Sequence, residues 1–423
     1  MRVLYVVHQF MPEFSGGTER VTLNLARAAQ ADGHHAEVAT VAVGAHPGWR
    51  VSSQGVAAEG AFTAMVEGVP VHALGPPTEP QVVQLGFDAD PRIDQLFTAF
   101  LAARPAFDVV HVMHPFRMLA AVEVLARRHI PYVVSLTDFF AICHRINLVR
   151  RDGALCGGPE GGEACRLHCQ APELPHPSYA TRFARLGAIL RSASAVAAVS
   201  DYVAGRVRAA HPDLPVLVIN NGVDLLSFAP PAPRVADRPL TLLYVGTVSE
   251  AKGAQVLVRA FARAAPAGVR LRVVGPCYDE AFAARLAQDV KGADISLEGA
   301  VEAASIPALI GDCDLICVPS QVPEAFSLAL YEGFAAGLPA LVSGLGNPAV
   351  VVAGLGCGRV IPAGDEDAWA AAIAEIARKP ALVDSWRAAV PLPFRIEEEA
   401  FLYGQLYRGV AGLRRWAPET VEA

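Results

Sequence analysis

Short runs of branched apolar residues alternate with longer segments whose apolar residues recur every three or four positions along nearly the whole chain. The short runs are typical of buried strands and the longer segments of helices. Strands that alternate with helices indicate an α/β protein with parallel sheets. We expect strands in the first half at residues 2–10, 35–43, 107–114, 130–137, 194–200 and 215–221, and helices at residues 19–33 and 116–129.

One proline-rich stretch, FAPPAPRVADRP at residues 228–239, interrupts this alternation. Its composition predicts a linker. Beyond it we expect strands at residues 240–246, 269–275, 295–299, 315–320 and 339–344. The pattern therefore predicts two doubly wound domains, residues 1–227 and 240–394. Residues 395–423 have apolar positions at helical spacing and predict a further amphipathic helix.

Composition and charge exclude several classes of protein. The length of 423 residues favours more than one domain, and 53% hydrophobic against 18% charged residues excludes disorder. Apolar runs stay shorter than a membrane span, and the first residues lack the features of a signal peptide, so we expect a cytoplasmic protein. A net charge of −7 without a long basic run argues against nucleic acid as a partner.

Ligands of open α/β sheets bind outside the carboxyl ends of the strands, so the residues that follow each strand are the candidate site residues. In the first domain, Gly16 and Gly17 stand between a strand and a helix that begins near Glu19. Glycines and a helix start suit a bound anion. A Gly-Gly turn without a ligand is the alternative, and the spacing does not match the dinucleotide fingerprint.

In the second domain, Gly246 and Gly275 end two strands and Lys252 follows the first of them. A lysine in such a loop can neutralise a phosphate, although an ordinary surface lysine would fit there equally well. Ser320 ends a third strand of the same series. The three strand ends together favour an anion site over three unrelated loops.

The segment PEAFSLALYEG, residues 323–333, carries Glu324 and Glu332 among apolar residues. We expect a helix from about Phe326, with the amides of residues 325–328 forming a site for a diphosphate. Glu324 could instead cap that helix. Glu332 has apolar neighbours on all sides, and a buried carboxylate requires hydrogen-bond donors, for which ligand hydroxyls are candidates.

These residues resemble the retaining glycosyltransferases of family 4, which carry an E-x7-E motif matched by Glu324 and Glu332. The resemblance extends to Gly16–Gly17, INNGVD at residues 219–224, VGTVSEAKG at 245–253 and LEGAV at 297–301. It implies a GT-B fold, in which two Rossmann-like domains with parallel sheets face a central cleft. It also implies that the terminal helix crosses back to the first domain.

The resemblance implies a role for each candidate residue. Glu332 would bind the ribose hydroxyls of a nucleotide-sugar and Glu324 would contact the sugar. Lys252 and the amides of Phe326, Ser327 and Leu328 would stabilise the leaving diphosphate. Gly16, Gly17, Gly246, Thr247 and Gly275 complete the expected donor site, although Thr247 stands where many relatives have arginine. Thr137 likewise replaces a histidine that reaches the sugar in many relatives, and Asp138 or His114 is the candidate substitute; we take Asp138 as a catalytic residue.

The activity implied by the resemblance is transfer of a sugar with retention of configuration and without a catalytic metal or cofactor. The acceptor would be a hydroxyl of a lipid-linked sugar, a glycan or a small molecule. The alternative is a nucleotide-sugar-binding GT-B protein without activity, which Thr137 and Thr247 make conceivable. A nicotinamide-dependent dehydrogenase is disfavoured because the dinucleotide fingerprint is missing.

Two further features concern partners other than the donor. Cys143, Cys156, Cys165 and Cys169 crowd into one loop. A structural zinc site is one hypothesis, with His144 and His168 as alternative ligands; unpaired thiols or an acceptor-binding loop are the others, because the spacing matches no familiar zinc motif. At the chain's end, Arg414, Arg415 and Trp416 suggest either peripheral contact with the inner face of a membrane or a solvated helix end.

Overall fold

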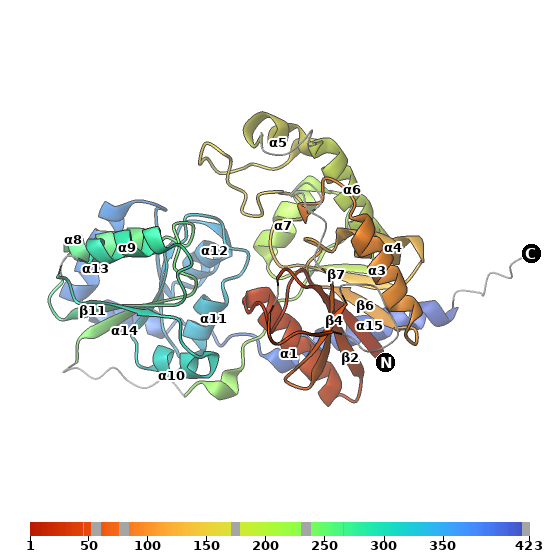
Figure 1. The fold of residues 1–423 in the computed structure, drawn as a ribbon. Helices are drawn as coiled ribbons and strands as arrows, with labels where there is room; N and C mark the ends of the chain where they lie inside the picture. Colours follow the sequence, from red (N-terminus) through yellow and green to blue (C-terminus); the bar gives the residue numbers. More distant parts are fainter. Residues whose placement is uncertain are drawn as a thin grey trace, which may run out of the picture. The chain divides into compact units, whose positions relative to one another are not determined.

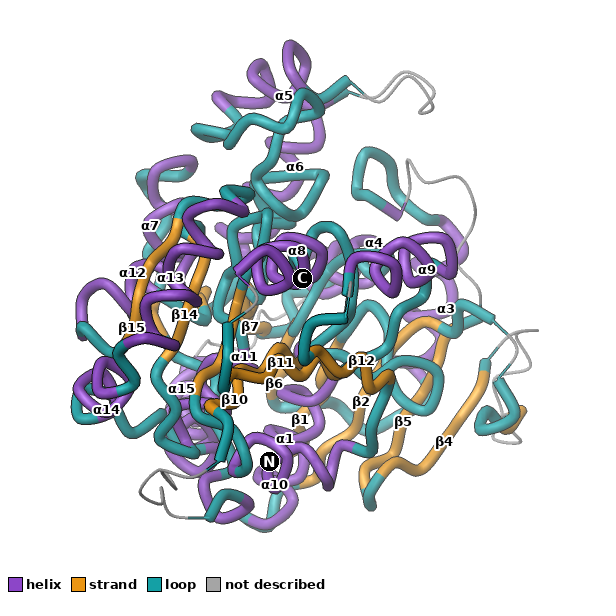
Figure 2. The backbone as a smooth tube through the Cα atoms, turned by 90° about the vertical axis from the view of Figure 1, so that its left-hand side faces the viewer, coloured by secondary structure: helices purple, strands orange, loops and turns teal. Residues whose placement is uncertain are grey.

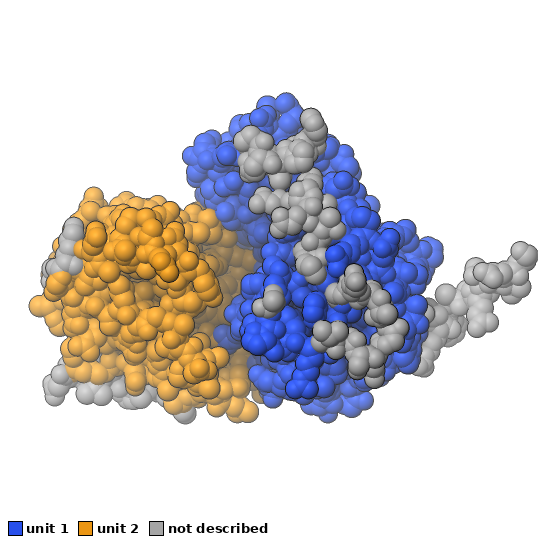
Figure 3. Space-filling model, in the orientation of Figure 1, with its two compact units in different colours: residues 1–221, 396–423 blue, residues 222–395 orange. Residues whose placement is uncertain are grey.

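The computed structural model describes residues 1–44, 46–51, 61–75, 84–170, 178–229, 238–264, 266–290 and 292–416. It divides the chain into two compact units, shown in Figure 3. Unit 1 comprises residues 1–221 and 396–423, and unit 2 comprises residues 222–395. The predicted linker had been placed at residues 228–239, of which 230–237 lie outside the described residues.

Unit 1 is built on a nine-stranded sheet with the order β3-β4-β5-β2-β1-β6-β7-β8-β9. The pairings among β5, β2, β1, β6, β7, β8 and β9 are parallel, and those of β3 with β4 and of β4 with β5 are antiparallel. The strands are β1 (Arg2–Val6), β2 (His35–Val41), β3 (Arg50–Val51), β4 (Phe62–Val66), β5 (Val69–Leu74), β6 (Val109–Val112), β7 (Tyr132–Leu136), β8 (Ala195–Ala198) and β9 (Leu217–Val218).

Helices of unit 1 lie between these strands in the chain, and the last helix of the chain also belongs to this unit (Figure 1). They are α1 (Gly17–Ala31), α3 (Pro91–Ala102), α4 (Leu119–Arg127), α5 (Glu163–His168), α6 (Tyr179–Ser192), α7 (Asp201–Ala210) and α15 (Ile396–Trp416). The side chains of Arg414, Arg415 and Trp416 lie outside the described part of the chain, so the expected membrane contact stays a prediction.

A buried polar network fastens α15 to the sheet of unit 1. The His111 imidazole on β6 bonds through Nδ1 to the Tyr407 hydroxyl at 2.6 Å and through Nε2 to the Ser135 hydroxyl at 2.7 Å. The Ser135 hydroxyl also lies 2.6 Å from the Tyr403 hydroxyl. Each bond joins a strand to α15 or to a neighbouring strand, so the terminal helix belongs to the core of unit 1 (Figure 1).

Unit 2 is built on a six-stranded, entirely parallel sheet with the order β12-β11-β10-β13-β14-β15. Its strands are β10 (Leu240–Val245), β11 (Val269–Val274), β12 (Ile295–Gly299), β13 (Leu315–Val318), β14 (Ala340–Ser343) and β15 (Gly358–Ile361). Its helices are α8 (Ala254–Ala264), α9 (Glu280–Asp289), α10 (Ile306–Gly311), α11 (Leu328–Ala335), α12 (Gly346–Leu355), α13 (Glu366–Arg378) and α14 (Ala381–Arg387).

Alternate residues of the central strands of unit 2 face two separate cores. Leu242 of β10 packs with α8, α9 and α13, whereas its neighbour Leu243 packs with α10, α11 and α12. This period of two places helices on both faces of the sheet, as Figure 2 shows for strands in orange and helices in purple. The two-faced burial explains why these strands read as continuous apolar runs.

The strands expected from the sequence are present, and the structure adds β3, β4, β5 and β15 to them. Within the described residues, no helix combines the length and the hydrophobicity required to span a bilayer. All the strand-end residues predicted to bind a ligand are described, so the site of each unit can be built from its own residues.

Candidate active site

The loops at the carboxyl ends of the strands of unit 2 approach one another so closely that glycine is required between them. A Cβ on Gly275 would lie 1.9 Å from the Gly246 carbonyl oxygen, and one on Gly253 would lie 1.9 Å from the Pro319 carbonyl oxygen. Gly253 and Gly275 both have positive φ, which other residues adopt rarely. These contacts hold the loops that follow β10, β11 and β13 together at one edge of the sheet.

Backbone hydrogen bonds fix the same three loops. The Gln321 amide donates to the Ala251 carbonyl at 2.8 Å, and the Val248 amide donates to the Pro276 carbonyl at 2.8 Å. Thr247, at the predicted donor site, is exposed, and its carbonyl accepts the Tyr244 hydroxyl at 2.5 Å. The loops are thereby placed by main-chain contacts, which leaves side chains such as that of Lys252 available for other roles.

Lys252 and Glu324, the two residues predicted to act on the donor, form an ion pair at this edge. The Lys252 ammonium lies 2.7 Å from Glu324 Oε1, and the Ser320 hydroxyl donates to the same carboxylate oxygen. The Glu324 side chain is 12% exposed and that of Lys252 is 43% exposed. Burial raises the pKa of the nearby Tyr244, and the Glu324 carboxylate raises it further.

Helix α11 begins at Leu328, two residues later than expected, and Ser327 is its N-cap. Ser327 has a φ of 75°, a conformation that costs a non-glycine residue energy and is concentrated at functional sites. The Ser327 side chain makes no capping hydrogen bond to this helix. One oxygen of Glu324 is bonded to Lys252 and Ser320, and a role of Glu324 as the cap stays a prediction. The N-cap side chain thus does not occupy the first amides of α11, the position at which helices bind anions.

Glu332 lies buried on α11, as the apolar sequence around it predicts. The Glu332 side chain is buried, and the expectation that ligand hydroxyls donate to its carboxylate stays a prediction. The proposed contact with ribose rests on the position of Glu332 in the E-x7-E motif.

Sequence reasoning missed the contribution of the loop after β14. A Cβ on Gly346, whose φ is 70°, would lie 2.3 Å from the Glu324 amide nitrogen, and the Asn347 amide donates to the Glu324 carbonyl at 2.9 Å. The Asn347 side chain also donates to the Tyr331 hydroxyl at 3.1 Å, and the Tyr331 ring stacks on Phe326. The available signal was a glycine pair, Gly344 and Gly346, directly after a predicted strand.

In unit 1 the Gly16–Gly17 turn is capped by the chain itself. The Gly16 amide donates to Glu19 Oε2 at 2.9 Å, so a carboxylate already occupies part of the anion position expected there. The second oxygen of Glu19 is buried without a hydrogen-bond partner and lies 3.7 Å from His8 Nε2. The helix begins at Gly17, two residues earlier than predicted.

Asp138 and His114 form a hydrogen-bonded pair at the ends of β7 and β6. His114 Nε2 lies 2.8 Å from Asp138 Oδ2, and His114 Nδ1 accepts the Phe116 amide at 3.1 Å. Because Nδ1 accepts a bond, Nε2 carries the proton that it donates to Asp138. The other Asp138 oxygen accepts the Phe140 amide at 2.7 Å. The carboxylate is thus held in one orientation, with its side chain 28% exposed.

Two residues beside this pair lack hydrogen bonds on buried atoms. The Thr137 hydroxyl and His8 Nδ1 both have none. The centroid of the His8 ring lies 4.4 Å from that of the His114 ring. Burial holds the pKa of His8 well below its usual value, and the Arg117 guanidinium lowers it further.

All eight cysteines are free thiols, including the four predicted to bind zinc. In the ranges that the structure describes, no group of three or more His, Cys, Asp or Glu side chains is gathered so that it could hold a metal ion. A preformed zinc site at Cys143, Cys156, Cys165 and Cys169 is therefore not present.

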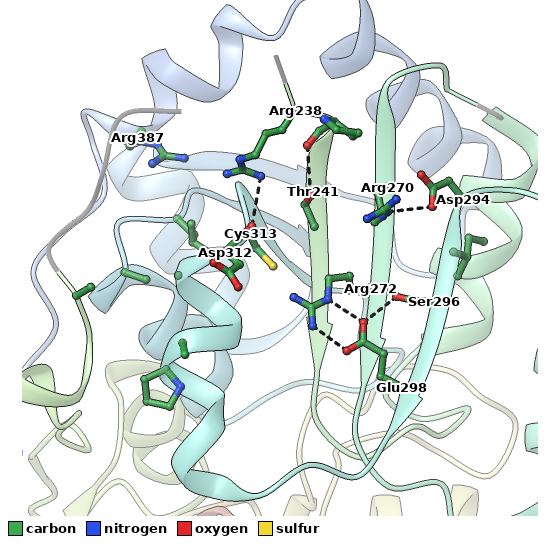
Figure 4. A pocket seen from close by; sticks show the side chains of 18 of the residues that line it. Arg238, Thr241, Arg270, Arg272, Asp294, Ser296, Glu298, Asp312, Cys313 and Arg387 are labelled. Atoms are coloured by element: carbon green, nitrogen blue, oxygen red, sulfur yellow. Dashed lines mark hydrogen bonds and ion pairs between the residues drawn. The ribbon is translucent and has the colours of Figure 1, made fainter. Parts of the chain in front are cut away.

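A large groove of about 1130 Å³ lies elsewhere in unit 2, between the first halves of β10, β11 and β12 and helix α10 (Figure 4). Arg272 pairs with Glu298, Arg270 with Asp294, and Arg238 with Asp314. The fourth arginine of the groove, Arg387, lies 3.8 Å from Asp314 and so shares that carboxylate with Arg238. The groove contains none of the residues predicted to bind the donor.

Comparison with known proteins identifies both halves of the chain. Residues 15–226 match the family model described as Glycosyltransferase Family 4, and residues 239–379 match that described as Glycosyl transferases group 1. A putative colanic acid biosynthesis glycosyltransferase, WcaL of Salmonella typhimurium, is 30% identical over 43% of this chain and 47% of its own. A phosphatidyl-myo-inositol mannosyltransferase of Mycolicibacterium smegmatis is 34% identical over 37% of this chain and 41% of its own. The chain thus matches less than half the length of these relatives.

Solved structures resemble the fold over almost the entire chain. Sucrose-phosphate synthase from Thermosynechococcus elongatus superposes with a TM-score of 0.71 at 20% identity, covering 97% of this chain and 99% of its own. Anabaena Alr3699/HepE in complex with UDP and glucose superposes with a TM-score of 0.68 at 17% identity, covering 97% and 100%. The fold is GT-B, as predicted. The match over residues 15–226, half of the chain, shows that the protein belongs to glycosyltransferase family 4.

Proposed function

We propose that the protein transfers a sugar from a nucleoside-diphosphate sugar to a hydroxyl acceptor, with retention of configuration and without a catalytic metal. The observation that carries this proposal is the Lys252–Glu324 ion pair just before the start of α11, where the N-cap side chain makes no capping hydrogen bond. A cation, a carboxylate and a helix N-terminus are the groups that a donor's diphosphate and sugar need as partners. Structures of Alr3699/HepE with UDP and UDP-glucose support the choice of donor class.

The leaving diphosphate would be stabilised by Lys252 and by the amides of Phe326, Ser327 and Leu328. As the bond between the anomeric carbon and the diphosphate breaks, negative charge grows on the phosphate oxygens. A preorganised ammonium and helix N-terminus accept this charge without reorganisation. Glu324 would then exchange its bond from Lys252 for bonds from sugar hydroxyls, while Glu332 would bind the ribose.

Retention would follow from attack of the acceptor oxygen on the face that the diphosphate leaves. The acceptor proton passes to an oxygen of the departing phosphate, so no carboxylate nucleophile is needed. Asp138 stays the catalytic residue that we propose in unit 1, where its carboxylate is oriented by His114 and the Phe140 amide. An oriented, partly exposed carboxylate is suited to accept a hydrogen bond from a sugar hydroxyl.

The acceptor class follows from the names of relatives. Those names include colanic acid biosynthesis, phosphatidyl-myo-inositol mannosyltransferase and lipopolysaccharide N-acetylglucosaminetransferase. All three concern polysaccharides or glycolipids. We therefore infer a role in glycan, polysaccharide or glycolipid synthesis, with a lipid-linked or glycan hydroxyl as acceptor.

A thermal-shift screen of UDP-, GDP- and ADP-sugars tests the donor. A ligand at a hundred times its Kd adds about 2.7 kcal/mol to the free energy of unfolding, which is a clear shift. The proposal fails if NADH stabilises the protein while every nucleotide-sugar leaves it unchanged. Binding without release of nucleoside diphosphate in the presence of acceptor extracts would instead support the inactive alternative.

A further inference from the structure

Arg182, near the start of α6, is a buried arginine of unit 1 that bonds to the main chain of two other segments. The residue is 4% exposed. Its Nε donates to the Leu85 carbonyl oxygen at 2.8 Å, and its Nη2 donates to the Phe140 carbonyl oxygen at 2.7 Å. Burial lowers the pKa of the guanidinium to about 10, so the group stays charged at neutral pH. Since a buried cation is costly unless its hydrogen bonds are made, these carbonyls determine where the guanidinium lies.

Two aromatic rings pack on the same guanidinium. Its central carbon, Cζ, lies 4.6 Å from the centroid of the Phe140 ring and 5.7 Å from that of the Phe87 ring. The guanidinium is planar and holds its donors in fixed directions, which the ammonium of a lysine does not. Leu85 and Phe87 precede α3, whereas Phe140 follows β7. Arg182 therefore joins α6 to two separate loops of unit 1.

Phe140 connects Arg182 to the pair formed by Asp138 and His114. The Phe140 carbonyl accepts the bond from Arg182, and the Phe140 amide donates to Asp138 Oδ1 at 2.7 Å. The centroid of the Phe140 ring lies 5.3 Å from that of the His114 ring, and His114 Nε2 bonds to the other Asp138 oxygen. A shift of Phe140 would thus disturb both groups that orient the Asp138 carboxylate.

We propose that Arg182 is a positioning residue, which holds Asp138 in the orientation needed for sugar transfer by fixing Phe140. This inference rests on the proposed function, in which Asp138 is catalytic. The bonds of Arg182 described above run to main-chain carbonyls, so the residue acts through Phe140 and not as a reacting group. Because a misplacement of about 1 Å can cost as much as about 10²-fold in rate, loss of this support should be visible in kcat.

Arg182→Lys tests the proposal, since it keeps the positive charge and removes the planar group that reaches both carbonyls. The assay is release of UDP, GDP or ADP from the nucleotide-sugar that stabilises the protein most, with acceptor extract present. We expect kcat to fall about tenfold and the KM of the donor to change less than about twofold. Arg185→Lys is the matched control on α6: Arg185 pairs with Glu123 at 3.1 Å, and the variant should keep the wild-type kcat. Unchanged kcat in Arg182→Lys overturns the proposal.

A double-mutant cycle separates positioning from a general structural role. In the Asp138→Asn background, Arg182→Lys should change kcat less than about twofold, because the carboxylate that it orients is already removed. A fall by the same factor in both backgrounds means that Arg182 supports the unit as a whole, which overturns the proposal. Melting temperatures of all four proteins establish that each is folded at the assay temperature.

Phe140→Leu covers the case in which Arg182→Lys does not fold. This variant keeps the amide and the carbonyl of residue 140 and removes the ring that packs on Arg182 and His114. Its kcat should fall in the wild-type background and change little in the Asp138→Asn background. Equal losses in the two backgrounds overturn the proposal as well.

The same assays distinguish failure of this inference from failure of the proposed function. If the wild type transfers sugar and Asp138→Asn lowers kcat, additive effects overturn the role of Arg182 alone. If Asp138→Asn matches the wild type, Asp138 is not catalytic and the role of Arg182 is overturned with it. A wild-type protein that releases no nucleoside diphosphate from any nucleotide-sugar overturns the proposed function, and this inference with it.

Discussion

The Lys252 ammonium lies 2.7 Å from the Glu324 carboxylate, although 72 residues separate the two in the chain. In the free protein the two residues proposed to act on the donor therefore satisfy each other. A donor that contacts both side chains must break this ion pair. The first two predictions therefore concern substitutions of Lys252 and Glu324.

Replacing Lys252 by alanine should lower the rate of sugar transfer about 10²–10³-fold, because the leaving diphosphate loses a preorganised cation. The free energy of unfolding should change by less than about 1 kcal/mol, since the ion pair is partly exposed. Steady-state kinetics and urea unfolding measure the two effects. Lys379→Ala, which removes an exposed lysine of unit 2, is the matched control and should leave the rate unchanged. Equal rates in the two variants would remove Lys252 from the site.

Replacing Glu324 by glutamine should strengthen the binding of UDP by up to about fivefold. In this variant Lys252 would not have to break an ion pair before it binds the diphosphate. Turnover should nevertheless fall, since the sugar loses a charged acceptor. Calorimetric titration with UDP separates the two effects. Glu250→Gln changes a carboxylate in the loop of Lys252 that is paired with Arg285, and it should bind UDP like the wild type. Weaker UDP binding in Glu324→Gln would mean that the carboxylate positions Lys252 for the phosphate.

Replacing Gly346 by alanine should lower the free energy of unfolding by about 1–3 kcal/mol, because φ is positive and the new Cβ meets the Glu324 backbone. Turnover should fall with it as Glu324 is displaced. Gly354→Ala is the control in the same helix: nothing lies within 4 Å of its Cβ. It should be neutral or stabilise by up to about 1 kcal/mol. Similar losses in the two variants would contradict the close approach of this loop to Glu324.

Acidification should destabilise unit 1 through His111. Burial lowers the pKa of His111 to about 3. Between about pH 3 and pH 6.5, His111 is therefore protonated in the unfolded chain but neutral in the folded protein. The contribution of neutral His111 to the free energy of unfolding is fully present well above pH 6.5. It decreases as the pH falls, by about 1 kcal/mol per pH unit near pH 5.5. Urea unfolding from pH 7 to pH 5 should show a smaller slope in His111→Gln than in the wild type. His168→Gln, a change at an exposed histidine of the same unit, is the control. Its free energy of unfolding should depend on pH as that of the wild type does.

Replacing Asp138 by alanine should reduce turnover at least about 10²-fold if its carboxylate meets a reacting hydroxyl. His114→Ala should cost less, because it removes only one of the two donors that orient Asp138. Kinetic assays of both variants test this ranking. Asp213→Ala, which removes an exposed carboxylate of unit 1 paired with Arg191, should behave like the wild type. Unchanged turnover in Asp138→Ala would remove it from the catalytic residues.

Most of the strands that were predicted correctly are buried on both faces, since continuous apolar runs such as Leu240–Val245 have few other structural uses. Strands β9 and β12 were also predicted, although neither contains a fully buried residue. Strand β5 escaped prediction because Pro70 and His72 interrupt its apolar pattern, although the proline is tolerated where β5 meets the antiparallel β4. Strand β15 is only four residues long and begins at a glycine.

Site residues could be predicted individually but not as pairs. Lys252 and Glu324 each follow a strand, yet their contact depends on β10 and β13 being neighbours in the sheet. The local pattern of apolar residues does not determine the order of the strands. The same holds for Gly346, whose role depends on the close approach of a third loop.

The network of His111, Ser135, Tyr403 and Tyr407 also has a consequence for synthesis of the protein. Unit 2 is one uninterrupted stretch, whereas unit 1 needs α15, which the ribosome makes after all of unit 2. Domains that emerge first normally fold first. In this chain the His111 imidazole on β6 and the Ser135 hydroxyl on β7 lack their tyrosine partners until translation has passed residue 407. The unit whose synthesis begins first is therefore the last to be completed.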